Sequence, residues 1–345
     1  MPTKAVHRAL VRVAVLVVAA ASLTAWSTGP ASAAPTTYQV KQLPLPSGWQ
    51  TGTTARGDGG KLLAGAGQDP DGVERPLLWK NGKVSALPSP GGVTAGGSDV
   101  NSKGVVLANT RPTDDAWPLP FVVTKKGGVV TLAVPPGART TIGYAINDAG
   151  LVVGYSYVGG AYHGIVWSIA TPNTYQDLGA GDGTLFLTGL TESGVIVGTT
   201  QNAHGDTRAL RGTLATGLSP LPGVDTHKSS GASGAAGAYV FGTGALPGTT
   251  GGWGILWNGD TPVALPPSLR ANGLNSQGLV AGYDVSTPLS ATAWANGTSW
   301  VLPGVAGPDT LAYSTFVTDV SETGVIAGSS GNADGTIVPV VWKRG

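Results

Sequence analysis

The chain of 345 residues has no cysteine and only 11% charged residues. Without thiols it cannot form disulfide bonds, carry a cysteine-linked lipid or use a cysteine nucleophile. A near-neutral chain with few charges also lacks the electrostatic footprint expected of a protein that binds nucleic acid or an anionic membrane. We therefore expect no nucleic-acid partner.

Long apolar runs are also missing, except for one near the N-terminus. Three cations precede the apolar segment 13–21, and Ala31-Ser32-Ala33 fits a signal-peptidase cleavage site. The segment is too short to span a bilayer, and no second run of spanning length follows. The sequence predicts a secretory signal peptide over residues 1–33 and one exported domain over residues 34–345, with no membrane insertion. Removing the three leader cations from the 20 basic residues leaves 17 against 19 acidic ones, a net charge of −2.

Glycine and proline, in contrast, are abundant, at 55 and 25 residues, and the glycines recur at a fixed phase. The best-kept unit is Ile146-Asn147-Asp148-Ala149-Gly150-Leu151-Val152-Val153-Gly154, and a segment ending in Trp167 follows it. Its anchor glycine has equivalents in seven copies, at positions 60, 104, 150, 194, 238 (an alanine), 278 and 324. A repeat of about 44 residues built from short strands is typical of a propeller blade.

Each copy divides into four expected strands, A to D. In the third copy these are residues 141–146, 151–155, 163–167 and 175–178. The A–B connection ends in glycine, and several C–D connections contain Asn-Gly, as tight hairpins require. The tryptophans at the end of strand C (Trp79, Trp167, Trp257, Trp294 and Trp342) recur at one phase, which favours blade packing over sugar binding.

The two ends of the chain together make up the missing part of the last copy. Complete copies continue from the tryptophan hairpin into an apolar-Leu-Pro segment, but the chain stops soon after Trp342. The segment Tyr38–Pro44 has the missing pattern. We predict an all-β, seven-bladed β-propeller of four-stranded antiparallel blades, with the N-terminal strand completing the last blade and closing the ring.

The repeat frame resembles the extracellular HAF-repeat family. It consists of two polar residues, a variable residue and glycine, then an apolar strand, a strand ending in tryptophan, and Asp177-Leu178-Gly179. No copy keeps the His-Ala-Phe tripeptide of that family, and the nearest are His163-Gly164-Ile165 and Arg208-Ala209-Leu210. The resemblance implies secretion and a β-repeat architecture, and it brings no established activity or catalytic residues.

Antiparallel blades place the B–C and D–A loops on one face of the ring and the A–B and C–D turns on the other. We call these the loop face and the turn face. The loops vary from copy to copy, and variable loops on a rigid scaffold commonly carry function. Four of their residues, His204, Asp206, Asp225 and His227, have the types needed for zinc binding or acid–base catalysis. Solvated loop residues are the simpler interpretation of these four.

A second candidate site is aromatic, and its residues are Trp117, Tyr155, Tyr157, Tyr162 and Tyr283. Exposed rings stack on the apolar faces of sugars. Asp69–Gly72 and Asn332–Gly335 have oxygen ligands beside a glycine turn, as fragments of calcium loops do, but neither continues into a full loop. Whether any metal binds is left open, and no cofactor is expected.

The sequence thus favours a secreted, non-catalytic binding module, expected to be a monomer, with an extracellular ligand such as polysaccharide or cell wall. The alternative is an extracellular lyase or hydrolase with its site on the loop face. A protein-interaction scaffold would need a large exposed apolar patch, and the polar loops do not indicate one.

Overall fold

The computed structural model describes residues 37–345 apart from 59–60, 92–93, 112–116, 182, 250–252, 287–289 and 308–314. The chain divides into two units, Met1–Pro35 and Thr36–Gly345. The leader expected at residues 1–33 therefore lies outside the described residues. The regular structure of the described residues is all β, and none of them belongs to a helix that is long and apolar enough to cross a membrane.

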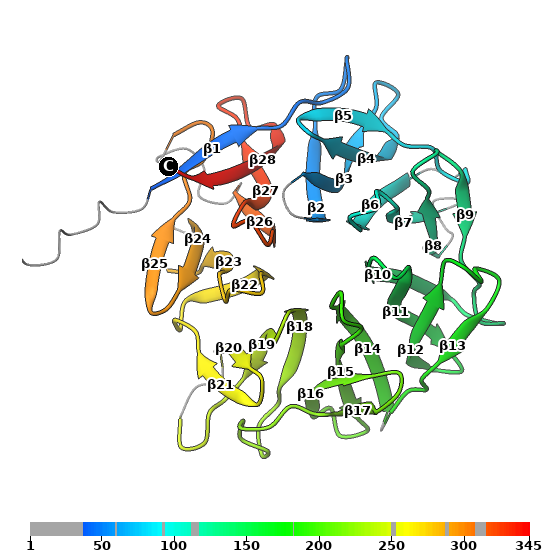
Figure 1. Cartoon of the computed structure of the whole chain (residues 1–345), viewed down its shortest axis with the longest axis vertical. Coiled ribbons are helices and arrows are strands. Elements are labelled where there is room, and N and C mark those ends of the chain that lie inside the picture. The colour runs from blue at the N-terminus through cyan, green and yellow to red at the C-terminus, as the bar shows by residue number, and fades with distance from the viewer. Residues whose placement is uncertain are drawn as a thin grey trace, which may run out of the picture. The chain divides into compact units, whose positions relative to one another are not determined.

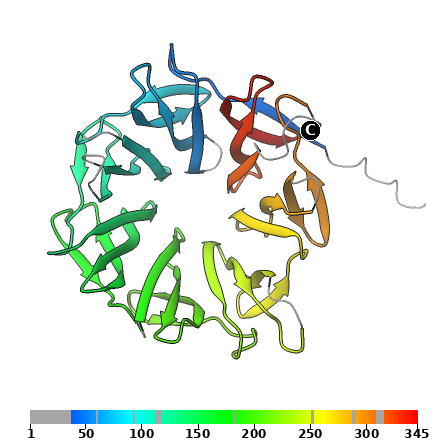
Figure 2. The ribbon, with the colours of Figure 1, turned by 180° about the vertical axis from the view of Figure 1, so that it is seen from behind.

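The described residues form seven four-stranded antiparallel blades arranged in a ring (Figures 1 and 2), which confirms the predicted seven-bladed propeller. Strands are given in the order A to D, from the channel outward. Blade 1 comprises β2 (Gly52–Asp58), β3 (Leu62–Gln68), β4 (Glu74–Lys80) and β5 (Lys83–Ala86); blade 2 comprises β6 (Thr94–Val100), β7 (Val106–Arg111), β8 (Leu119–Val123) and β9 (Val129–Thr131). Blade 3 comprises β10 (Thr140–Ile146), β11 (Leu151–Val158), β12 (Ala161–Ser168) and β13 (Tyr175–Asp177); blade 4 comprises β14 (Gly183–Leu190), β15 (Ile196–Asn202), β16 (Thr207–Thr213) and β17 (Gly217–Pro220). Blade 5 comprises β18 (Gly231–Ala236), β19 (Tyr239–Gly244), β20 (Trp253–Asn258) and β21 (Thr261–Ala264); blade 6 comprises β22 (Leu269–Leu274), β23 (Val280–Asp284), β24 (Ser290–Ala295) and β25 (Thr298–Val301).

Blade 7 combines both ends of the described chain. It comprises β26 (Phe316–Val320), β27 (Ile326–Gly331), β28 (Ile337–Arg344) and, as its outermost strand, β1 (Tyr38–Gln42). Strand β1 pairs antiparallel with β28, from Tyr38 opposite Arg344 to Gln42 opposite Val340. The predicted closure by the N-terminal strand is therefore confirmed, and the ring has no open seam here.

Strand B packs against neighbouring blades on both of its faces. In β11, Val152 belongs to an apolar cluster with Leu107 of blade 2, whereas Val153 belongs to a cluster with Leu187 of blade 4. Both valines are fully buried. Each contributes about 1.5–3 kcal/mol through burial. Burial on both faces explains why strand B is apolar without alternation.

The strand-C tryptophans join blades, as their fixed phase predicts. Trp79, Trp167, Trp257 and Trp342 are each no more than 2% exposed. Their indole N–H groups donate to carbonyls of the preceding blade's outer segment, at Pro44 (2.7 Å), Ala133 (2.7 Å), Pro222 (3.0 Å) and Pro303 (2.7 Å). In blade 4, Arg211 replaces the tryptophan and donates instead to Gly259 O of blade 5 at 2.7 Å.

The A–B turn forms a second contact between blades. Asn147 Oδ1 accepts the N–H of Leu151 at 3.0 Å and closes the turn, while its Nδ2 donates to Thr191 O of blade 4 at 3.2 Å. Asn101 and Asn275 make the same pair of bonds in blades 2 and 6. Gly150 has φ +77°, which a glycine adopts without strain. The polar-polar-x-Gly motif is therefore both a turn and a joint between blades.

Candidate functional site

The inner strands of all seven blades contain a register irregularity near the middle. Such a bulge re-aims a side chain out of the regular ladder. Several residues at these positions line the central channel, namely Arg56, Ser98, Tyr144, Asn272 and Thr318. The bulges therefore provide the channel with its side chains.

Arg56 extends from blade 1 across this channel. Its Nη1 donates to Tyr144 O at 3.4 Å and its Nη2 to Thr188 O at 3.2 Å, and its guanidinium lies 4.8 Å from the centre of the Tyr144 ring. A cavity of about 340 Å³ lies beside Arg56 towards the loop face, and one of about 500 Å³ lies towards the turn face. Arg56 therefore divides the channel into two chambers.

Two carboxylates face the turn-side chamber, Asp99, which is buried, and Asp319, which is partly buried. Asp99 Oδ2 accepts the N–H of Ile146 and Asp319 Oδ2 that of Gly57, both at 2.9 Å and both from the next blade. Burial raises the pKa of Asp99 to about 7 and that of Asp319 to about 6, although Arg56 and the backbone bonds act in the opposite direction. Sequence analysis did not select these residues. The available signal was a charged residue inside strand A, where the other copies have glycine or alanine.

The predicted histidine and aspartate group does not form a metal site. Asp206 Oδ2 accepts from Asn202 Nδ2 at 3.2 Å within its own turn, and Asp225 Oδ1 accepts the N–H of His227 at 2.9 Å within the next loop. The two loops do touch, since an Arg208 nitrogen donates to Thr226 O at 2.6 Å. Nevertheless, no group of three or more His, Asp or Glu in the described part of the chain is placed to hold a metal ion. Asp206 and Asp225 thus contribute to local turns.

The two calcium-like fragments are also turn caps. Asp69 Oδ1 accepts the N–H groups of Asp71 (3.1 Å) and Val73 (2.8 Å), and Asp69 Oδ2 pairs with Arg75 at 3.2 Å. The bond from Val73 holds the pKa of Asp69 below its ordinary value. Asp334 Oδ1 likewise accepts the N–H of Thr336 at 2.9 Å. Both carboxylates therefore serve the loop backbone.

Three of the predicted aromatic residues do come together on the loop face. Tyr162 lies 5.6 Å from Tyr155 and 4.9 Å from Tyr157 between ring centroids. Phe186 of blade 4 completes the cluster, at 5.1 Å from Tyr155 and 4.6 Å from Tyr162. Tyr155 is half-buried, and this burial raises the pKa of its hydroxyl. The sequence analysis did not select Phe186. The usable signal was its bulky ring, because the strand-A segments of most copies have small side chains.

Trp117 belongs to the same region, but Tyr283 does not. Trp117 is 56% exposed and lies two residues before β8, the strand C of blade 2. Its neighbour Pro118 accepts the N–H of Thr141 at 3.2 Å, so Trp117 lies at the edge of blade 3. Tyr283 belongs to β23 of blade 6, on another part of the ring (Figure 1). We call Trp117, Tyr155, Tyr157, Tyr162 and Phe186 the aromatic patch.

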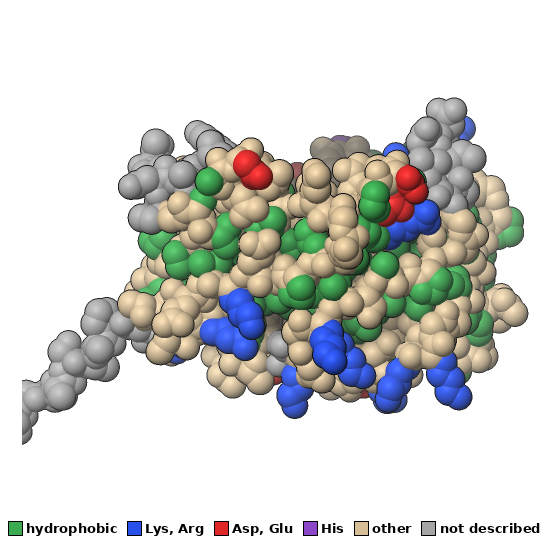
Figure 3. Space-filling view, turned by 90° about the horizontal axis from the view of Figure 1, so that it is seen from above, with side chains coloured by type: hydrophobic (Ala, Val, Ile, Leu, Met, Phe, Trp, Pro, Cys, Tyr) green, Lys and Arg blue, Asp and Glu red, His purple; other side chains and the backbone are tan. Residues whose placement is uncertain are grey.

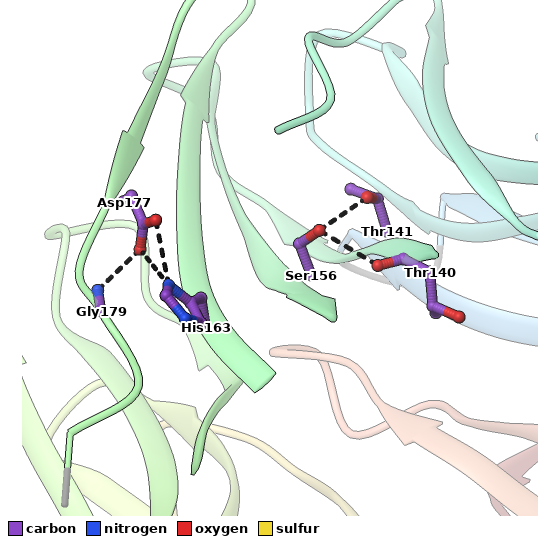
Figure 4. Close-up of polar contacts among 6 residues, drawn as sticks. All are labelled: Thr140, Thr141, Ser156, His163, Asp177 and Gly179. Atoms are coloured by element: carbon purple, nitrogen blue, oxygen red, sulfur yellow. Dashed lines mark hydrogen bonds and ion pairs between the residues drawn. The ribbon is translucent and has the colours of Figure 1, made fainter. Parts of the chain in front are cut away.

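Blade 3 also carries a serine, a histidine and an aspartate in one row (Figure 4). His163 Nδ1 lies 3.0 Å from Asp177 Oδ2, and Asp177 Oδ1 accepts the N–H of Gly179 at 2.7 Å. The Ser156 hydroxyl instead contacts Thr141 Oγ1 at 2.8 Å and donates to Thr140 O at 3.1 Å, pointing away from His163 (Figure 4). A nucleophile needs its base within hydrogen-bond reach. This row is therefore not arranged as a catalytic triad.

Several solved propellers share this fold. A puromycin-hydrolyzing peptidase from Mycobacterium tuberculosis matches with a TM-score of 0.59 and 13% identity, over 88% of this chain and 53% of the peptidase. The β-propeller domain of the Trilobed protease from Pyrococcus furiosus matches with a TM-score of 0.56 and 7% identity, over 86% and 97% of the two chains. Virginiamycin B lyase from Staphylococcus aureus matches with a TM-score of 0.51 and 13% identity, over 89% and 99%.

These likenesses show that the protein is a β-propeller. At sequence identities of 7–13% they show the fold alone. The chain spans about half the length of the peptidase. The Pyrococcus domain is described as having an open velcro topology, whereas β1 closes blade 7 here. No protein-family model matches the chain, and no curated protein does.

Proposed function

We propose that this propeller is a secreted, non-catalytic binding module whose ligand is an extracellular carbohydrate, such as a cell-wall polysaccharide. The observation that carries the proposal is the aromatic patch. Four mutually packed rings and an exposed tryptophan lie on the face that has the variable loops. Packing of the rings against one another holds them rigid, and rigid aromatic surfaces lose little entropy when a sugar ring stacks on them.

Polar groups at the edge of the patch suit sugar hydroxyls. Arg139 is exposed, and its backbone N–H donates to Tyr157 O at 2.9 Å, so this residue adjoins the patch. The tyrosine hydroxyls add groups that both donate and accept. Carbohydrate sites combine an apolar platform with a few directed polar groups.

An extracellular lyase or hydrolase is the alternative, and the geometry favours it less. Acid–base catalysis needs two titratable groups that converge on one reacting atom. His204, Asp206, Asp225 and His227 belong to adjoining loops, but Asp206 and Asp225 are hydrogen-bonded within their own turns. The lyase likeness supports the fold only.

The test is retention of residues 34–345 on insoluble polysaccharides and cell walls, with and without a chelator. We expect retention that resists the chelator and falls about tenfold in Trp117→Ala and Tyr157→Ala, because buried aromatic anchors dominate such contacts. Phe316→Ala is the matched control, since Phe316 is 44% exposed and belongs to blade 7. Equal retention of Trp117→Ala and the parent on every surface would refute the proposed patch.

Export and membership of the HAF-repeat family are part of the same proposal. Both are supported by the leader pattern and the repeat frame of the sequence. Expression of the full chain in a secreting host, followed by mass spectrometry, tests the export. We expect a product that begins at Ala34 in the medium, and an uncleaved product retained in the cell would contradict it.

A further inference from the structure

The lysines of this protein are concentrated on one face. Nine lysines follow the leader, and seven of them lie on the turn face of blades 7, 1 and 2. Six are exposed and form no ion pair with another described residue, and we call them the lysine face: Lys61, Lys80, Lys83, Lys125, Lys126 and Lys343. The seventh, Lys103, donates to Asp148 O at 2.5 Å. In Figure 3, which shows the ring from its side, most of the visible basic side chains lie along one of its two faces.

Blade 1 brings three of these lysines to one end of the blade. Lys80 and Lys83 are paired across the two-residue turn between β4 and β5. Lys61 adjoins them, because its carbonyl accepts the N–H of Asn81 at 3.1 Å. Like charges directly opposite each other in an antiparallel pair are destabilising. An anionic partner would relieve this repulsion.

The neighbouring blades extend the same charge. Lys125 and Lys126 form the tip of the β8–β9 hairpin of blade 2, between Thr124 and Gly127. Lys343 is paired with Gln39 at the end of β28 in blade 7. Next to it, the Arg344 guanidinium lies 4.9 Å from the centre of the Trp300 ring. The cations therefore follow an arc over three adjacent blades.

Among the described residues, no acidic side chain forms an ion pair with this arc. The four ion pairs between described residues involve Arg75, His163, Arg211 and Lys228, none of which belongs to the lysine face. The nearby Glu322 carboxylate accepts the N–H of Ser276 of blade 6 at 3.1 Å. Asp69, Asp206, Asp225 and Asp334 lie on the loop face, whereas Asp148, Glu192, Asp260 and Glu322 lie in turns of blades 3, 4, 5 and 7 on the turn face, and Asp58 ends β2 of blade 1. A net charge of −2 is therefore compatible with a local excess of lysines over the turns of blades 7, 1 and 2.

We propose that the lysine face binds a linear polymer of phosphodiester-linked polyols, such as a poly(glycerol phosphate) of a cell wall. Lysine ammonium groups bind phosphate as point charges, and their flexible stems suit a chain whose charges are not fixed in space. Release of condensed counterions provides the driving force.

Nucleic acid and membrane fit this surface less well. The tryptophans next to Lys80 and Lys343 are buried, and Arg344 covers the Trp300 ring, so these rings offer no platform for base stacking. The lysine segments also lack the apolar side chains that anchor a protein in a lipid interface. The choice of a wall polymer rests in addition on the proposed export.

The test measures binding of residues 34–345 to poly(glycerol phosphate) over a range of salt concentrations. We expect the parent to bind, and K80Q/K83Q/K125Q/K126Q to lose at least about tenfold in affinity at about 0.1 M salt with a shallower salt dependence. The matched control is K41Q/K228Q, which removes two exposed or half-exposed lysines outside the face and is expected to bind like the parent. Circular dichroism establishes that each variant keeps the parent fold.

Three results would overturn the proposal. They are no parental binding at low salt, equal losses in the control, and stronger binding to anionic vesicles or to duplex DNA of equal charge than to the polymer. The lysine variants are also measured on the polysaccharide panel, and Trp117→Ala on the polymer. If the two sites are separate, the lysine variants lose binding to the polymer only and Trp117→Ala loses binding to polysaccharide only. A failure of one proposal is thereby distinguished from a failure of the other.

Discussion

At the residue scale, one position of strand A decides how closely neighbouring blades approach. The position just after the bulge is Asp99 in blade 2 and Asp319 in blade 7, but Gly273 in blade 6. A Cβ on Gly273 would lie 2.7 Å from backbone atoms of Asp319 and Val320, so no side chain fits there. The gap between blades 2 and 3 instead holds the buried Asp99 carboxylate, and the gap between blades 7 and 1 holds the partly buried Asp319 carboxylate.

These carboxylates predict an unusual pH dependence of stability. Because the pKa values of about 7 for Asp99 and about 6 for Asp319 lie above the ordinary value of 3.8, the native state binds protons more tightly than the unfolded chain. Their stabilising contribution is full below about pH 4 and is lost as the pH rises through 6 to 7. We expect urea unfolding to show a decrease on the order of 2 kcal/mol between about pH 5 and pH 8.

The matched variants are Asp99→Asn and Asp319→Asn, compared with Asp71→Asn in an exposed loop. Relative to the parent, Asp99→Asn and Asp319→Asn are each expected to gain stability between pH 5 and pH 8, because an amide does not ionise as the pH rises through the pKa of the carboxyl that it replaces. Each should also flatten the pH profile. A profile that keeps the parental slope in both variants would assign the effect to other groups.

At the element scale, the A–B turn is the unit that the repeat conserves along the chain. Its first polar residue closes the turn in blades 2, 3, 4, 6 and 7. Only asparagine also reaches the next blade, because its amide donates while its oxygen accepts. The choice of Asn, Thr or Ser therefore decides whether a turn is a joint between blades.

Asn147 provides a test of this distinction. Asn147→Ala is expected to lower the free energy of unfolding by about 2–3 kcal/mol, because it removes two bonds from a residue that is 2% exposed. Asn147→Thr copies the residue found at position 191, keeps the turn bond and loses the bond between blades, at a cost of about 1 kcal/mol. Equal losses in denaturant unfolding of the two variants would contradict the separate roles.

At the scale of the whole molecule, closure depends on residues from both ends of the chain. Strand β1 covers the edge of β28, and Leu43 continues into an apolar cluster with Leu63, Leu77 and Trp79 of blade 1. Pro44 O also accepts the Trp79 indole. The N-terminal segment therefore ties blade 7 to blade 1.

Deletion of residues 36–46 should lower the melting temperature by more than about 10 °C and promote association through the uncovered edge of β28. Calorimetry and light scattering measure the two effects. Lys41→Ala, an exposed change within β1, is the control, and it should melt like the parent. Addition of a peptide of residues 36–46 should restore part of the lost stability. An unchanged melting temperature after the deletion would show that β1 does not close the ring.

Much of this architecture could be predicted from the sequence, because its causes are local. Glycine at a fixed phase sets the turns, an unbroken apolar strand indicates burial on both faces, and the interrupted last copy indicates closure by the N-terminus. The bounds of the strands are predicted less exactly than their existence. For strand B of blade 3 the sequence predicts residues 151–155, whereas β11 continues to Val158. Three residues of the aromatic patch, Tyr155, Tyr157 and Tyr162, could be predicted because the repeat places them on or beside a B–C loop of the loop face.

The tertiary structure alone decided which side chains meet across blades. Phe186 joins the tyrosines from the next copy, Arg56 crosses the channel to Tyr144 and Thr188, and the lysines of three blades share one face. These encounters depend on the rotation of each blade relative to the last and on the bulge that turns a side chain into the channel. The repeat pattern determines the strands and turns within each blade. Only the closed ring determines which side chains of different blades come into contact.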